Sequence, residues 1–171
     1  EGNHPDLLWV EPTYQHQGQL IPRSEAIAQG VAKRSLPQLR LEQVRAISRF
    51  LARRPLEGEH CLVVIEAVEM MAEGAANALL KTLEEPGNGL LVLLTSAPER
   101  LLSTIRSRCQ QIVFGRLDPA SLQAVLHRQA DLQPVADGPE AAGLIALAAG
   151  SPGALLHHRE QWQLLPPGLA E

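Results

Sequence analysis

The chain has 171 residues, of which 45% are hydrophobic and only 3% aromatic, so it is long enough to bury an aliphatic core. Its formal net charge of −4 gives no general electrostatic attraction to nucleic acid. Cys61 and Cys109 are too few for a disulfide framework or a complete zinc site, and no apolar run reaches the roughly 20 residues that span a bilayer. We therefore expect a soluble, cytoplasmic protein.

The first part of the chain combines a short strand pattern with a long irregular stretch. Leu7 to Val10 form an apolar run that predicts a strand. Residues 11–38 contain prolines and glycines among polar residues, with a weak helical pattern near 26–32, so we expect a long loop or insertion. Residues 41–51 repeat apolar side chains on one helical face and predict a helix. The arginines at its end either offset the helix dipole, which is the simpler interpretation, or face an acidic partner: Arg45, Arg49, Arg53 and Arg54.

The central stretch, residues 61–114, has the pattern of an α/β sheet. Residues 61–65 and 90–95 are apolar runs of the length of parallel strands buried on both faces. Apolar residues at helical spacing between them predict a crossover helix, which a Pro-Gly pair ends. Residues 111–114 predict a third strand after an arginine-rich turn. In such sheets, functional sites lie beyond the carboxyl ends of the strands.

After residue 114 the pattern predicts helices only. Asp118-Pro119 and Ser151-Pro152 each place a capping residue before a proline, which is typical of helix starts. We expect helices over about 119–129, 139–149 and 152–165, with a loop at 131–138, Gly150 ending the second helix and Pro166-Pro167-Gly168 ending the third. The expected division is an α/β domain over residues 1–116 and a small helical subdomain over 117–171.

Most catalytic patterns are missing. Lys81-Thr82 lies inside the predicted helix with no glycine just before it, so it is not a phosphate-binding loop. His4, His16 and His60 lack the paired spacing of metal ligands, and we interpret them as solvated side chains. Cys109, close to Arg106 and Arg108, either has a lowered pKa or, as we favour, is a small residue entering a strand.

Two acidic groups are more informative. Glu66 and Glu69 follow the first central strand, where a nucleotide-hydrolysing α/β protein places carboxylates, although a solvated turn would have the same pattern. Glu84 and Glu85 end a helix, where the dipole disfavours acids, and Lys81 precedes Glu84 in the less favourable order. Because residues that oppose local preferences often contact something else, we expect Lys81, Glu84 and Glu85 to belong to an interface.

The segments AANALLKTLEEP at 75–86 and APERLLSTIRSRC at 97–109, supported by residues 2–6 and 150–155, carry a family resemblance. They closely resemble the AAA+ subunits of the bacterial DNA polymerase III clamp loader, and the delta-prime type most. The resemblance implies a partial AAA+ P-loop NTPase-like sheet followed by a helical lid. It also implies that Ser107, Arg108 and Cys109 form the SRC motif, whose arginine reaches ATP in the neighbouring subunit, and that Thr95 and Ser96 occupy the sensor-1 position.

Two departures from the family pattern bear on catalysis. The acidic pair that follows the Walker B strand falls on Glu66 and Ala67, so one carboxylate is missing. Gly153 falls where motor subunits carry a sensor-2 arginine. These departures favour a non-hydrolysing stator, a subunit without turnover of its own within the DNA-directed DNA polymerase III holoenzyme, a nucleotidyltransferase complex. The alternatives are a gamma/tau-type or other AAA+ ATPase motor whose phosphate loop lies outside this chain, and an AAA+-like interaction module outside DNA replication.

The resemblance also implies partners and missing parts. The partners would be the gamma/tau motor subunits and delta, with the sliding clamp and primer-template DNA reached through the assembled complex, and no membrane. The chain itself would hold no metal or cofactor, because ATP binds to the neighbouring subunit. In the family a Walker-A-like segment and a four-cysteine zinc module come earlier and a collar domain follows, so we expect this chain to be a central fragment.

Overall fold

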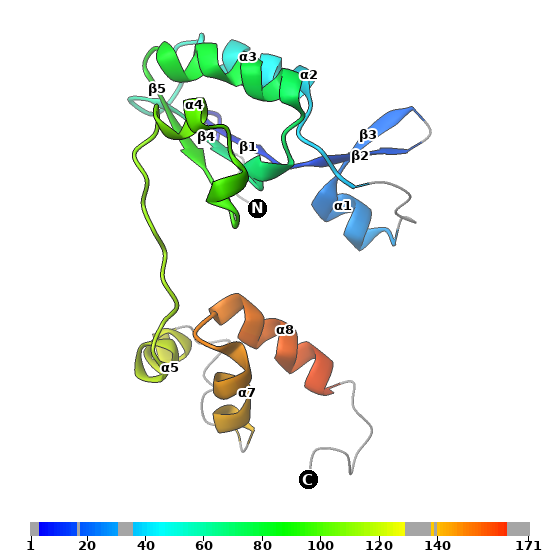
Figure 1. Ribbon diagram of the computed structural model, residues 1–171, viewed down its shortest axis with the longest axis vertical. Coiled ribbons are helices and arrows are strands. Elements are labelled where there is room, and N and C mark those ends of the chain that lie inside the picture. Colours follow the sequence, from blue (N-terminus) through cyan, green and yellow to red (C-terminus); the bar gives the residue numbers. More distant parts are fainter. Residues whose placement is uncertain (1–3, 17, 31–35, 129–137, 139, 164–171) are drawn as a thin grey trace. The chain divides into compact units, whose positions relative to one another are not determined.

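A computed structural model describes residues 4–16, 18–30, 36–128, 138 and 140–163 (Figure 1). The chain divides into two compact units, residues 1–111 and residues 112–171. The division expected after residue 116 stays a prediction.

The first unit contains a parallel sheet of three strands, β1 (Leu7–Val10), β4 (Cys61–Ile65) and β5 (Gly89–Leu93), in the order β1-β4-β5. Leu7 pairs with Leu62, and Cys61 pairs with Gly89. Helix α2 (Leu41–Leu51) lies between β1 and β4 in the chain, and α3 (Glu73–Glu84) lies between β4 and β5. The two helices lie side by side on one face of the sheet (Figure 1). The predicted α/β sheet with crossover helices is confirmed.

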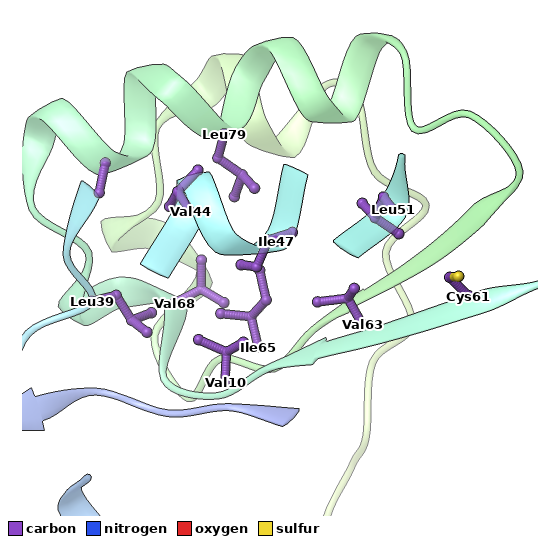
Figure 2. Close-up of a cluster of buried hydrophobic side chains, with 11 residues drawn as sticks. Val10, Leu39, Val44, Ile47, Leu51, Cys61, Val63, Ile65, Val68 and Leu79 are labelled. Carbon is purple, nitrogen blue, oxygen red and sulfur yellow. The ribbon is translucent and has the colours of Figure 1, made fainter. Parts of the chain in front are cut away.

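The core of this unit lies between that helical layer and the sheet. In Figure 2 the side chains of Val44 and Ile47 from α2 and Leu79 from α3 lie on the helical side of the core and those of Val63 and Ile65 from β4 on the sheet side, and all five are almost completely buried. The arrangement follows from two periods, because i, i+3 and i+7 share a helix face whereas alternate residues share a strand face.

The expectation that both central strands are buried on both faces is wrong for β5. Leu90 in β5 is 58% exposed, and Leu94 just after it is 41% exposed. Trp9 of β1 is also 54% exposed. Within the described residues, α2 and α3 cover only one sheet face. An apolar run reports the tendency of a strand to be buried, but the presence of a second covering layer is a property of the tertiary structure.

The expected third strand is also wrong, because residues 111–114 are assigned to no strand. Ile112, Val113 and Phe114 are 73%, 79% and 91% exposed. A strand needs a neighbour that satisfies its backbone groups, and no described strand pairs with this segment. β5 likewise has only β4 as a described neighbour.

Residues 11–38 are more regular than expected. Strands β2 (Thr13–His16) and β3 (Gln19–Pro22) form an antiparallel hairpin, which corrects the predicted loop. Helix α1 (Arg23–Ala28) follows and overlaps the helical pattern expected near 26–32 only at 26–28, while 31–32 lie outside the described residues. Gly18 takes a φ of +81° in the connection, a conformation that glycine tolerates best. A two-stranded ribbon has only edge strands, so Pro22 can end β3 without breaking a central ladder.

Two short 3-10 turns, Val68–Met70 and Pro98–Arg100, follow β4 and β5, and the short helix α4 (Ser103–Arg106) precedes the arginine-rich turn. Ile105 is 2% exposed and anchors α4, which packs against α3.

The second unit contains helices α5 (Pro119–Arg128), α7 (Ala141–Ala148) and α8 (Pro152–Gln163). The predicted caps are confirmed: Asp118 accepts hydrogen bonds from the Ser121 N–H (2.9 Å) and hydroxyl (2.6 Å), and the Ser151 hydroxyl accepts one from the Ala154 N–H (3.2 Å). These bonds, that of the Ser121 hydroxyl first, lower the pKa of Asp118. The unit has its own core: Leu122, Leu126, Leu144, Ala148 and Leu155. The loop expected at 131–137, the end expected at 165 and Pro166-Pro167-Gly168 lie outside the described residues.

Candidate functional site: the Arg108 turn and the carboxyl edge of the sheet

The turn after α4 holds Arg108 by its backbone and by its side chain. The Ser107 N–H donates to the Ser103 carbonyl (2.9 Å), and the Arg108 N–H donates to that of Ile105 (3.1 Å). The Arg108 guanidinium donates from Nε (3.0 Å) and Nη2 (2.5 Å) to Oε1 of Glu84, and from Nη1 to the Thr104 carbonyl (3.0 Å). Two predicted site residues that are 24 positions apart, Arg108 and Glu84, are therefore in contact.

This contact gives the unusual acid at the end of α3 a partner within the chain. The side chains of Arg108 and Glu84 are 35% and 51% exposed, so solvent screens the pair and its net stabilisation is at most about 1 kcal/mol. Lys81 is exposed in the last turn of α3, and Glu85 is exposed directly after the end of the helix. Their role in an interface stays a prediction.

Both interpretations of Cys109 from the sequence, a lowered thiol pKa and a small residue entering a strand, are wrong. Its side chain is half-buried, and this burial raises the pKa of the thiol, so the lowered pKa considered from the neighbouring arginines is wrong. The favoured description as a residue entering a strand is also wrong, because residues 111–114 form no strand.

The carboxyl edge of the sheet brings Thr95, Ser96 and Glu69 together. The hydroxyls of Thr95 and Ser96 donate to the Glu69 carboxylate at 2.7 Å and 2.9 Å. Burial raises the pKa of Glu69, but the hydrogen bonds that it accepts, first that of Thr95, outweigh this effect and the pKa lies below its usual value. The two residues predicted to occupy the sensor-1 position are thus hydrogen-bonded to a carboxylate in the turn after β4.

Glu66, the other acid after β4, has a different partner. Its Oε1 accepts a hydrogen bond from the indole Nε1 of Trp9 in β1 (2.7 Å). Ala67 follows with a φ of 48°, a left-handed conformation that costs a non-glycine residue about 1–2 kcal/mol. The two residues predicted to occupy the Walker B position are therefore one carboxylate, already hydrogen-bonded to Trp9, and a strained alanine.

Several other predicted residues have structural surroundings. Thr82 is buried in α3 and its hydroxyl shares a hydrogen bond with that of Ser48 in α2 (2.8 Å), so the Lys-Thr pair lies inside a helix as predicted. Gly153 is an exposed residue in the first turn of α8. Arg53 lies over the Phe50 ring, 3.9 Å from its centroid, and donates to the Pro5 carbonyl, which are structural contacts.

Asp6 is an important residue that sequence reasoning missed. The residue is 2% exposed, and its carboxylate accepts hydrogen bonds from the backbone N–H groups of Leu56 (2.7 Å), Glu57 (2.8 Å) and Gly58 (2.8 Å). These bonds, that of Gly58 first, lower the pKa of Asp6 to about 2. They join the start of β1 to the loop before β4. An Asp just before a strand was the only local signal, and it does not identify partners some 50 residues away.

A pocket of about 180 Å³ lies beside Glu69, and its charged lining residues are Glu69, Glu73 and Arg100. Arg108 and Glu66 do not line it. The described ranges contain no group of three or more His, Cys, Asp or Glu side chains that could hold a metal ion. No helix in the same ranges is both long and apolar enough to cross a membrane.

Residues 1–118 match the protein family described as "DNA polymerase III, delta subunit". The chain belongs to this family. It is 35% identical over 134 residues to DNA polymerase III subunit delta' of Bacillus subtilis, covering 78% of this chain and 34% of that protein. It is 34% identical over 152 residues to subunit delta' of Pseudomonas aeruginosa, covering 88% and 39%. The chain thus spans little more than a third of the length of these family members.

Subunit tau of Escherichia coli is similar over a shorter stretch, at 34% identity over 111 residues, which cover 64% of this chain and 17% of tau. Among solved structures, a DNA polymerase III gamma subunit-related protein of Thermotoga maritima superposes with a TM-score of 0.62 at 22% identity. This match covers 97% of the chain and 49% of that structure, and it confirms the expected partial AAA+ fold.

Proposed function

We propose that the complete protein is a non-hydrolysing stator subunit of the DNA polymerase III clamp loader. In this role it supports the loading of sliding clamps during DNA replication, and it supplies Arg108 to ATP bound by the neighbouring gamma/tau motor subunit. Its other partners are delta and, through the assembled complex, the sliding clamp and primer-template DNA. The chain itself needs no cofactor, because the nucleotide belongs to the neighbour.

The observation that carries the proposal is the Arg108 turn. Arg108 lies in the turn that follows the short helix α4, which the buried Ile105 anchors, and its side chain remains 35% exposed. A planar guanidinium presents several N–H donors in a fixed geometry, which suits the oxygens of a phosphoryl group that gains charge during transfer. An arginine placed in this way can act on a nucleotide that its own chain does not bind.

The lack of turnover rests on two different positions. Ala67 has no carboxylate to orient an attacking water, and Glu66 is bonded to Trp9. Gly153 has no side chain that could contact phosphate. Both positions support a subunit that assists hydrolysis elsewhere without carrying it out.

The test is DNA-stimulated ATP hydrolysis by a loader reconstituted with the complete protein carrying Arg108→Ala. Loss of an arginine finger lowers turnover by about 10³-fold or more at the ATP site that it serves. The total rate of ATP hydrolysis should therefore fall by the fraction that this site contributes, and clamp loading should fall with it. Arg106→Ala is the matched control, because Arg106 is the exposed last residue of α4. Unchanged hydrolysis and loading with Arg108→Ala would remove the finger role.

The similarity to subunit tau favours a second candidate, a motor ATPase whose phosphate loop lies outside this chain. It requires that the complete protein, purified alone, bind ATP tightly and hydrolyse it. Such activity would overturn the stator proposal, whereas a protein with no turnover of its own supports it.

A further inference from the structure

Hydrogen bonds to Glu84 and Thr104 hold the guanidinium of Arg108 in place. Three of its five N–H donors are used, by Oε1 of Glu84 at Nε and Nη2 and by the Thr104 carbonyl at Nη1. The other two N–H groups have no partner among the residues that the structure describes, so they remain for a ligand. The contacts therefore fix the plane of the guanidinium without using all its capacity to bind an anion.

We propose that Glu84 is a positioning residue for Arg108, which orients the guanidinium toward the phosphate of the neighbouring subunit before that nucleotide arrives. This inference rests on the proposed function of Arg108. An arginine side chain has many rotamers. A contact that already selects one of them reduces the conformational entropy that the side chain loses when it binds the phosphate.

The residues that hold Arg108 are themselves fixed by the fold. Glu84 is the last residue of α3, a helix whose Leu79 is completely buried and whose Thr82 is hydrogen-bonded to Ser48 of α2. Thr104 belongs to α4, which Ile105 anchors. The orientation of the guanidinium is thus tied to two packed helices, which gives a side chain a more definite position than a loop would.

The choice of an acid at this position is not explained by helix stability. A carboxylate in the last turn of a helix opposes the helix dipole. The contact with Arg108 offsets this unfavourable interaction of Glu84 with the helix dipole. The Arg108 side chain is 35% exposed, so an incoming phosphate can still reach it. The negative charge of Glu84 also allows the opposite effect, in which the carboxylate restrains Arg108 and keeps it from the phosphate. The two effects have opposite signs in an activity measurement.

The experiment uses the loader reconstituted with the complete protein and compares Glu84→Ala, Glu84→Gln, Arg108→Ala and the double variant Glu84→Ala/Arg108→Ala. We expect Glu84→Ala to lower the kcat of DNA-stimulated ATP hydrolysis at the served site by about three- to tenfold, as for coupled residues in contact, with little change in the KM for ATP. Glu84→Gln should lie between it and the wild type, because an amide oxygen still accepts from Nε and Nη2. The double variant should match Arg108→Ala alone.

Glu42→Ala is the control, since Glu42 is an exposed acid of α2 that has no place in the proposed interface, and thermal unfolding of each variant checks the fold. A rise in kcat with Glu84→Ala would mean that Glu84 restrains Arg108 and keeps it from the phosphate. An unchanged kcat would overturn the positioning role and show that the contact is only a surface ion pair. An effect of Glu84→Ala that persists in the Arg108→Ala background would place its action elsewhere. If Arg108→Ala itself has no effect, the proposed function fails, whereas an effect of Arg108→Ala without one of Glu84→Ala overturns only the positioning role.

Discussion

Asp6 and Glu84 show how the role of one carboxylate depends on its surroundings. Asp6 is buried and accepts three backbone N–H groups, so it is held in its charged form and fixes the loop before β4. Glu84 is half-exposed and accepts from a single arginine. The first geometry serves the fold, whereas the second leaves the partner able to bind a further group.

The lowered pKa of Asp6 predicts how stability depends on pH. Because the folded-state pKa is about 2 and lies below the usual Asp value of about 4, Asp6 stabilises the fold above that usual value. Its contribution is lost as the pH falls from about 4 toward 2. Asp6→Asn should therefore be less stable than the wild type at neutral pH, with the difference shrinking in acid. Urea unfolding between pH 7 and pH 2 measures this, with Glu85→Gln as an exposed control. A difference that does not change with pH would contradict the role of the ionised carboxylate.

At the scale of the element, the junction between α7 and α8 depends on glycine. Gly150 has a φ of +82°, and a Cβ added there would lie 2.3 Å from the carbonyl oxygen of Leu117 and 2.9 Å from its nitrogen. Gly153, three residues later, has no atom within 4 Å of such a Cβ. The same substitution therefore meets a backbone clash at one position and open space at the other.

We expect Gly150→Ala to lower the free energy of unfolding of the second unit by about 1–2 kcal/mol for the left-handed backbone alone, with the clash adding to it. Gly153→Ala should raise it by up to about 1 kcal/mol, because alanine is the better helix former. Denaturant unfolding followed by the helical circular dichroism signal measures both. Equal effects of the two substitutions would show that the Gly150 conformation is not required.

At the scale of the molecule, the two units have separate hydrophobic cores. Leu79 and Leu126 are each completely buried, the first among residues of α2, α3 and β4 and the second among residues of α5, α7 and α8. A cavity in one core removes contacts only from the elements that line it.

Leu79→Ala and Leu126→Ala should each destabilise their own unit by about 2–5 kcal/mol, the usual cost of such a cavity. In amide hydrogen exchange, Leu79→Ala should lower the protection of β4 and α2, and Leu126→Ala that of α7 and α8. Leu56→Ala, which removes the same atoms from a side chain that is 72% exposed, should have little effect. Loss of protection in both units from either buried substitution would show that the cores unfold together.

Elements whose signals are local could be predicted from the amino-acid sequence. Helix periodicity placed α2 and α3, short apolar runs placed β1 and β4, and the caps at Asp118 and Ser151 placed two helix starts. The segments at 75–86 and 97–109 indicated the family and marked Arg108. These signals are readable because burial follows a period of 2 or 3.6 residues along the chain.

Contacts between residues that are distant in the chain became known only from the three-dimensional structure. It paired β2 with β3, left residues 111–114 without a strand partner, and joined Glu66 to Trp9 across 57 positions. It also placed Glu84 against Arg108, so an acid that seemed misplaced on its helix gained a partner. The physical reason is that strand pairing and side-chain hydrogen bonds join groups far apart in the chain, whose approach no local periodicity encodes.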